Sequence, residues 1–143
     1  MLARLHSHID GRDVPPTGGR YSDKFDPRTA TKVQEVARSP SEDLDHAVTA
    51  ASKALAAWRK LRPTERGRIL VDVGRAVRTQ GGHLGEIESL ETGKPGREMA
   101  TLIDLTAEFF EYYGGIVHLA DGEQLDVGPG YHAYTRREPF GVV

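Results

Sequence analysis

The chain has 143 residues, of which 38% are hydrophobic and 28% are charged, and its net charge is −2. That length corresponds to one domain, which buries roughly two-thirds of the surface of its unfolded chain. The nearly neutral charge argues against a nucleic-acid-binding protein. No apolar run reaches the length of a membrane span, and residues 1–13 lack the apolar centre of a signal peptide. We therefore expect a cytoplasmic protein with neither nucleic-acid nor membrane partners.

The first 38 residues have the composition of strands and turns. Asp10 and Gly11 form a turn signal between two short extended pieces, and Asp26-Pro27 is a second turn initiator. Apolar and polar residues then alternate over residues 33–37, which is typical of a short strand. This region predicts an N-terminal β-hairpin or a pair of edge strands.

A first helix is predicted from Ser39 to about Arg59. Ser39 is a suitable N-cap, Pro40 suits the first helical position, and Glu42 completes a capping box. The following apolar residues recur at the i, i+3, i+4 spacing of one helix face. They are Leu44, Ala47, Val48, Ala51, Ala54, Leu55 and Trp58. This stripe predicts a face that packs against a core.

Three further helices are predicted between residues 64 and 119. Thr64 is the expected cap of the second, the Gly81-Gly82 pair interrupts the pattern, and a short third helix ends at Gly93. The fourth, from about residue 97 to 119, is apolar nearly all round, which predicts burial on most of its sides. Its aromatic pairs, at 109–110 and 112–113, are therefore interpreted as core rather than as a ligand cage.

The stretch ESLETGKPGRE, residues 88–98, allows two interpretations. A phosphate-binding loop needs G-x-x-x-x-G-K-[ST], and Gly93 and Lys94 match its second half. However, Glu88 stands where the first glycine is needed and Pro95 where the hydroxyl is needed. A helix end is favoured, because glycine readily adopts the left-handed conformation and proline cannot continue a helix.

The C-terminal residues read as extended chain. Residues 131–138 look like a strand with polar side chains on both faces, and Pro139 interrupts it. Residues 140–143 begin an apolar, β-branched run of the kind found in buried parallel strands. Since a domain seldom ends two residues into a central strand, the sequence favours a fragment of a larger fold.

The sequence contains none of the common catalytic patterns. Cysteine is absent, which excludes disulfides, thiolate metal ligands and a thiol nucleophile supplied by this chain. None of the sixteen glycines has the G-x-G-x-x-G spacing of a dinucleotide-binding loop. His6 and His8 form an H-x-H pair without a further ligand at close spacing, which favours a solvated tail. The residues alone therefore predict a mostly helical, incomplete α/β piece without a visible active site.

Six segments in a fixed order nevertheless resemble one enzyme family. They are FDPRTATKVQEVA, EDLDHAVTAASKALAAW, ERGRIL, ESLETGKP, EYYGG and YTRREPFGVV. Together they resemble the N-terminal part of the NAD(P)-dependent aldehyde dehydrogenases, and they look most similar to betaine aldehyde and trimethylaminobutyraldehyde dehydrogenases. The resemblance implies an α/β fold in which residues 1–129 form the N-terminal part of the coenzyme-binding domain. Residues 130–143 would begin the oligomerisation arm and a truncated sheet strand.

The resemblance also implies a chemistry that this chain does not perform by itself. Members of the family oxidise an aldehyde to a carboxylic acid through a cysteine thiohemiacetal, with NAD or NADP as the hydride acceptor. The parts that bind the cofactor and carry the reaction follow the region that these 143 residues resemble. We therefore expect scaffold without catalytic or cofactor-binding residues, inactive alone, from an enzyme that acts on a small aldehyde and forms a homo-oligomer. The alternative is a non-catalytic remnant or a subunit-interaction module.

One minor site of the family maps onto this sequence. Many members hold K+ or Na+ through backbone carbonyls just before an Asn-Pro turn and through an acidic residue in a D-T-G-K-P segment. The matching positions are Lys24, Phe25 and Glu91. Two departures are that Asp26 replaces the asparagine and that glutamate replaces the commoner aspartate at position 91. The alternative for this segment is a plain helix end.

Overall fold

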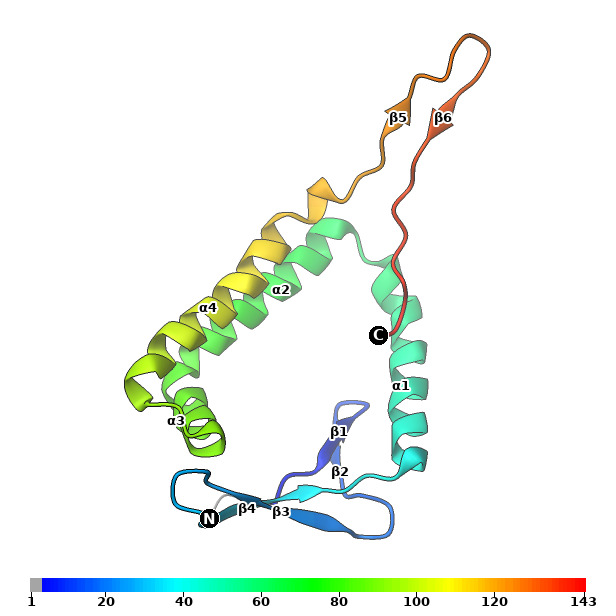
Figure 1. The fold of residues 1–143 in the computed structure, drawn as a ribbon. Coiled ribbons are helices and arrows are strands. Elements are labelled where there is room, and N and C mark those ends of the chain that lie inside the picture. The colour runs from blue at the N-terminus through cyan, green and yellow to red at the C-terminus, as the bar shows by residue number, and fades with distance from the viewer. Residues whose placement is uncertain (1–3) are drawn as a thin grey trace.

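The computed structural model describes residues 4–143, and Figure 1 shows how its elements are arranged. Within that part of the chain it contains six short strands, four α-helices and one 3₁₀ turn. In chain order these are β1 (Ser7–Ile9), β2 (Arg12–Val14), β3 (Tyr21–Phe25), β4 (Lys32–Ala37), α1 (Ser41–Lys60), α2 (Pro63–Thr79), α3 (Gly81–Thr92), α4 (Gly96–Gly115), the 3₁₀ turn (Val117–Leu119), β5 (Gln124–Leu125) and β6 (Ala133–Tyr134). The chain is thus a mostly helical α/β structure with small antiparallel hairpins, as the sequence predicted.

Two hairpins occupy the N-terminal region. β1 and β2 pair antiparallel around Asp10 and Gly11, whose φ angles are 52° and 73°. Positive φ at both central residues is the two-residue turn whose twist matches a hairpin, and it confirms the predicted turn. β3 and β4 form the second hairpin, with Tyr21 opposite Ala37 and a register irregularity between Lys24 and Phe25.

The predicted caps of the first two helices are wrong. α1 begins at Ser41 with Pro40 as its N-cap and without a side-chain cap. The Ser39 hydroxyl lies 2.8 Å from the Ser7 hydroxyl, so a contact with the first hairpin takes the place of the cap. α2 begins at Pro63, because proline already has the φ of a first helical residue, and Thr64 therefore lies inside the helix.

Glycine lets α2 and α4 approach each other closely. A Cβ atom at Gly114 would lie 2.7 Å from the carbonyl oxygen of Gly67, and one at Gly74 would lie 2.9 Å from that of Ala107. The paired positions run in opposite directions along the chain, so the helices are antiparallel (Figure 1). The two backbones touch at these positions, which makes this helix pair the packed centre of the structure.

Few apolar side chains are buried elsewhere. Among the described residues the buried hydrophobic side chains are Val33, Met99 and Ala107. Large apolar side chains on α1 and α4 remain exposed, namely Leu44, Val48, Trp58, Leu105, Phe109, Tyr112 and Tyr113. The predicted burial of these faces is therefore wrong for this chain, because α1 stands apart from the α2–α4 pair and no described element covers them (Figure 1).

The C-terminal segment forms a thin hairpin that extends away from the helices (Figure 1). α4 ends at Gly115, and the predicted helix continues only as a 3₁₀ turn. β6 covers two residues of the predicted strand at 131–138 and pairs with β5. Residues 140–143 form no strand, contrary to prediction, since no described strand lies beside them to supply hydrogen bonds. Within residues 4–143 no helix combines the length and the apolar character needed to cross a bilayer.

Candidate functional site

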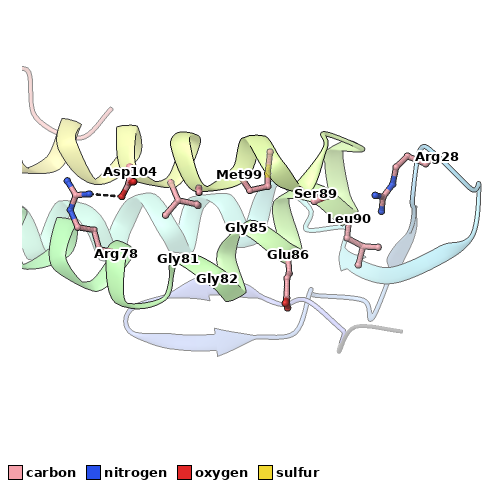
Figure 2. A pocket seen from close by; sticks show the side chains of 13 residues that line it. Arg28, Arg78, Gly81, Gly82, Gly85, Glu86, Ser89, Leu90, Met99 and Asp104 are labelled. Carbon is pink, nitrogen blue, oxygen red and sulfur yellow. Dashed lines mark hydrogen bonds and ion pairs between the residues drawn. The ribbon is translucent and has the colours of Figure 1, made fainter.

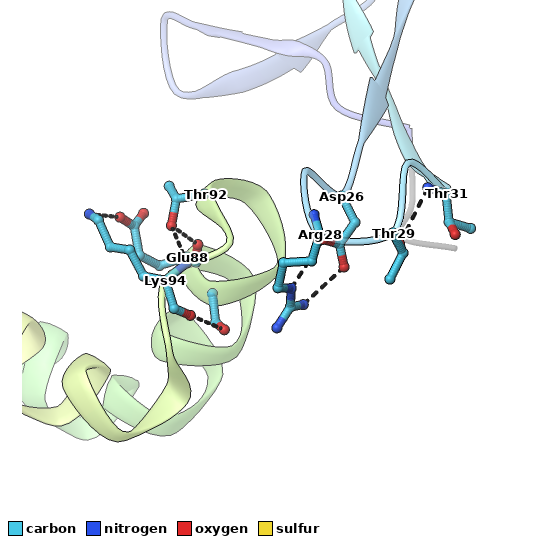
Figure 3. A network of polar contacts seen from close by, with 8 residues as sticks. Asp26, Arg28, Thr29, Thr31, Glu88, Thr92 and Lys94 are labelled. Atoms are coloured by element: carbon cyan, nitrogen blue, oxygen red, sulfur yellow. Dashed lines mark hydrogen bonds and ion pairs between the residues drawn. The ribbon is translucent and has the colours of Figure 1, made fainter.

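The end of α3 is a glycine C-cap. Gly93 has a φ of 76°, in the left-handed region, and its N–H donates to the Ser89 carbonyl at 2.9 Å. Lys94 Nζ lies 2.8 Å from Glu88 Oε1 (Figure 3). The lysine that a phosphate loop would use is therefore paired with a carboxylate. These contacts confirm the interpretation of this stretch as a helix end.

The turn between β3 and β4 lies against this helix end. Asp26 is buried, and its carboxylate accepts hydrogen bonds from the Arg28 backbone N–H at 2.8 Å and from the Arg28 guanidinium at 2.9 Å (Figure 3). These bonds hold the pKa of Asp26 below its usual value. A Cβ atom at Gly93 would lie 2.9 Å from Pro27 Cγ. The absence of that atom lets the turn and the helix cap touch.

Two of the three predicted cation-site residues meet here, but through an unexpected contact. Lys24 Nζ lies 2.6 Å from Glu91 Oε2, and the two side chains are 32% and 23% exposed. Phe25 follows the register irregularity of β3, and its side chain is half-exposed. Because the ammonium already balances Glu91, these residues as arranged do not fit a K+ or Na+ ion. Ligation by the backbone carbonyls of Lys24 and Phe25 stays a prediction.

Other groupings of metal ligands are not formed within residues 4–143, where no cluster of three or more His, Asp or Glu side chains is suited to a metal ion. His8 Nδ1 lies 2.9 Å from Asp13 Oδ1, and His6 Nδ1 lies 3.0 Å from the Tyr21 hydroxyl. The two histidines of the H-x-H pair thus contact different partners. They lie in and beside β1 rather than in the solvated tail that the sequence favoured.

A groove of about 620 Å³ runs between α3 and α4. Figure 2 shows Arg78 at one end of it and Arg28 at the other, with Gly81, Gly85 and Met99 between them. Small residues on α3 open this groove, and the glycine-rich composition of residues 81–85 was the only sequence signal for it.

Both arginines at the ends of the groove are neutralised. Arg78 lies 2.6 Å from Asp104 and 3.1 Å from Glu111, and the bond with Arg78 lowers the pKa of Glu111. Arg28 is bound by Asp26. Since each arginine has a carboxylate partner, neither end of the groove offers a free cation to an anionic ligand. Glu86 and Ser89 also line the groove.

The described residues form a mostly helical α/β structure, and comparison with known proteins identifies its family. Residues 14–143 match the family model described as the aldehyde dehydrogenase family. The chain therefore belongs to the aldehyde dehydrogenase family.

Solved structures of this family share the fold. A putative aldehyde dehydrogenase from Burkholderia cenocepacia is 32% identical with a TM-score of 0.89, over 94% of this chain and 28% of that protein. PnpE, described in complex with nicotinamide adenine dinucleotide, is 34% identical with a TM-score of 0.88, over 97% of this chain and 28% of that protein. A structure of PnpE from Pseudomonas sp. WBC-3 is 33% identical with a TM-score of 0.89, over 95% and 28%. An NAD-dependent aldehyde dehydrogenase from Sinorhizobium meliloti is 27% identical with a TM-score of 0.83, over 90% and 26%.

These comparisons confirm the family and the fold expected from the sequence. The chain spans little more than a quarter of the length of the solved relatives. Similarity to the betaine aldehyde and trimethylaminobutyraldehyde enzymes stays a prediction, as does the domain boundary between residues 129 and 130. β5 and β6 pair with each other across that boundary.

Proposed function

We propose that this chain provides scaffold to an enzyme that oxidises an aldehyde to a carboxylic acid with NAD or NADP. The observation that carries the proposal is the family match over residues 14–143, together with relatives 32% and 34% identical that the chain covers for 28% of their length. One of these relatives is described in complex with NAD, which supports that cofactor class. The exposed apolar faces of α1 and α4 would pack against the remaining parts of such an enzyme.

The reaction would draw its chemical groups from outside these 143 residues. A thiolate attacks the aldehyde carbonyl, hydride leaves the resulting thiohemiacetal, and water releases the acid from the acyl-enzyme. This sequence holds no cysteine and no dinucleotide-binding fingerprint. These residues would position and cover the other parts of the enzyme, and both arginines at the ends of the groove between α3 and α4 are paired with carboxylates.

We also propose that the complete enzyme is a homo-oligomer, that it is cytoplasmic and that it acts on a small aldehyde. β6 is paired on one edge by β5, and a strand with one open edge can pair with a strand of another subunit. The hairpin also extends away from the helices (Figure 1), where a second copy could reach it. Similarity to the betaine aldehyde and trimethylaminobutyraldehyde group would direct the enzyme toward aldehydes with a quaternary ammonium group.

The proposal predicts that the 143-residue chain alone has no activity. The purified chain is incubated with a panel of aldehydes and with NAD or NADP, and formation of the reduced cofactor is followed by absorbance. An intact family member in the same assay is the positive control. Reduced cofactor above the level without protein would contradict the assignment of these residues to scaffold.

A non-catalytic interaction module is the second candidate. The exposed aromatic surface of α4, with Phe109, Tyr112 and Tyr113 all more than half exposed, favours it. The two candidates differ in the gene beyond codon 143. An in-frame continuation with the asparagine and cysteine motifs of the family supports the enzyme, and a stop codon supports the module.

A further inference from the structure

The ion pair between Lys24 and Glu91 suggests how this chain manages the negative charge at the end of α3. The carbonyl groups of a helix C-terminus carry about half a negative charge, so carboxylates there are unfavourable without a cation. The last two turns of α3 contain Glu86, Glu88 and Glu91 but no basic residue. Positive charge must therefore come from outside the helix.

Lysines from flanking segments supply that charge for the two carboxylates nearest the helix end. Lys94, which follows the C-cap, lies 2.8 Å from Glu88. Lys24, from β3, lies 2.6 Å from Glu91, and both members of this second pair are largely buried. Partial burial strengthens the attraction, because water screens the pair less than it screens an exposed one.

A second monovalent cation at Glu91 would meet the ammonium at close range. Like charges about 4 Å apart repel by about 4 kcal/mol at the effective dielectric of a protein surface. This repulsion lowers the affinity of Glu91 for a second cation. The ammonium is attached to the chain and needs no capture from solution, which favours it over a free ion.

We propose that the Lys24 ammonium permanently takes the place of a bound K+ or Na+ at Glu91, so that this chain is independent of monovalent cations. The pair also ties β3 to α3 next to the second contact between the same segments, where Pro27 meets Gly93. The ammonium group of Lys24 is thus a cation supplied by the chain itself, and it attaches the second hairpin to the end of α3.

The test compares thermal unfolding of the purified protein in KCl, NaCl and choline chloride at equal ionic strength. For the wild type we expect the same Tm in all three salts, since no ion is bound. Lys24→Met keeps the length of the side chain but removes its charge. We expect its Tm in choline chloride to fall by roughly 1–5 °C, and KCl or NaCl to restore part of that loss.

Two further variants serve as controls. Lys32 is 34% exposed and pairs with Asp23 and Glu35, both within the second hairpin, so its ion pairs do not involve α3. Lys32→Met should lower Tm to the same degree in every salt. Adding Glu91→Gln to Lys24→Met should remove the response to K+ and Na+, because the carboxylate that would bind the ion is gone.

Three results would overturn the proposal. The first is a wild-type Tm that is higher in KCl or NaCl than in choline chloride, with a difference that Glu91→Gln abolishes. The ion would then bind beside the lysine. The others are a Lys24→Met variant as stable as the wild type, or one that is destabilised equally in all salts. If Lys24→Met does not fold, the wild type and Lys24→Arg decide: equal Tm values in all salts support the proposal, and a cation-specific increase contradicts it. Because no aldehyde or cofactor enters these measurements, their outcome is independent of the proposed enzymatic function.

Discussion

At the scale of single residues, Asp43 shows how one carboxylate joins distant segments. It lies in the first turn of α1 and is buried. Its two oxygens accept hydrogen bonds from the Thr17 hydroxyl at 2.6 Å and from the Thr17 N–H at 3.0 Å. These bonds hold the pKa of Asp43 below its usual value of 3.8. The loop between β2 and β3 is thereby attached to the start of α1.

This contact predicts a pH dependence of stability. A carboxyl group whose pKa is lower in the folded state stabilises the fold above the unfolded-state pKa. That stability is lost as the pH falls through the folded-state pKa. Urea unfolding at about pH 6 and at about pH 3 should therefore show a larger loss for the wild type than for Asp43→Asn. Asp45→Asn, an exposed position on the same helix, is the control and should behave like the wild type. Equal losses in the wild type and in Asp43→Asn would show that this carboxylate does not titrate with folding.

Residue chemistry that is local to the sequence was predictable, and chemistry that depends on a distant partner was not. The turn at Asp10-Gly11 and the C-cap at Gly93 follow from the conformational freedom of glycine, and both are confirmed. The cap at Ser39 failed because its hydroxyl bonds to Ser7, which is 32 positions away in the chain. The ion pair between Lys24 and Glu91 could not be predicted, because the two residues are far apart in the sequence and only the fold brings them together.

At the scale of elements, the α2–α4 contact depends on the absence of side chains. A Cβ atom at Gly67 would clash with the carbonyl oxygen of Gly114. Gly67→Ala should therefore push the helices apart and destabilise the fold by about 1–3 kcal/mol, as overpacking does. Gly82→Ala is a matched control, since it also lies in a helix but has open space around its Cβ position. Its better helix propensity should leave stability unchanged or raise it by up to about 1 kcal/mol.

Urea unfolding of both variants measures these free energies. A Gly67→Ala variant as stable as Gly82→Ala would mean that the helices do not touch at that position.

The existence of all four helices was predictable from their apolar spacing, because that pattern is a property of each segment. Whether the apolar faces of α1 and α4 are buried could not be predicted in the same way, because burial depends on which other elements pack against them.

At the scale of the whole molecule, the length of the chain and its apolar surface bear on the proposed scaffold role. The chain covers 28% of the length of relatives that are 32% and 34% identical to it. Large apolar side chains are exposed on α1 and α4, and also on α2 and along the C-terminal segment, where Phe140 and Val143 are fully exposed. Large exposed apolar patches are a feature of surfaces that contact other protein. Both observations support the proposal that these residues are scaffold of an aldehyde dehydrogenase.

A chimera tests whether these residues act as scaffold in such an enzyme. In the NAD-dependent aldehyde dehydrogenase from Sinorhizobium meliloti, the segment that this chain matches is replaced by the chain itself, and NADH formation is measured with an aldehyde that the parent oxidises. The same protein without the segment is the negative control. The account predicts a folded chimera that forms NADH, while the control does not, because the exchanged residues position the reaction without taking part in it. A chimera that folds like its parent yet forms no NADH, or a control as active as the chimera, would contradict the account.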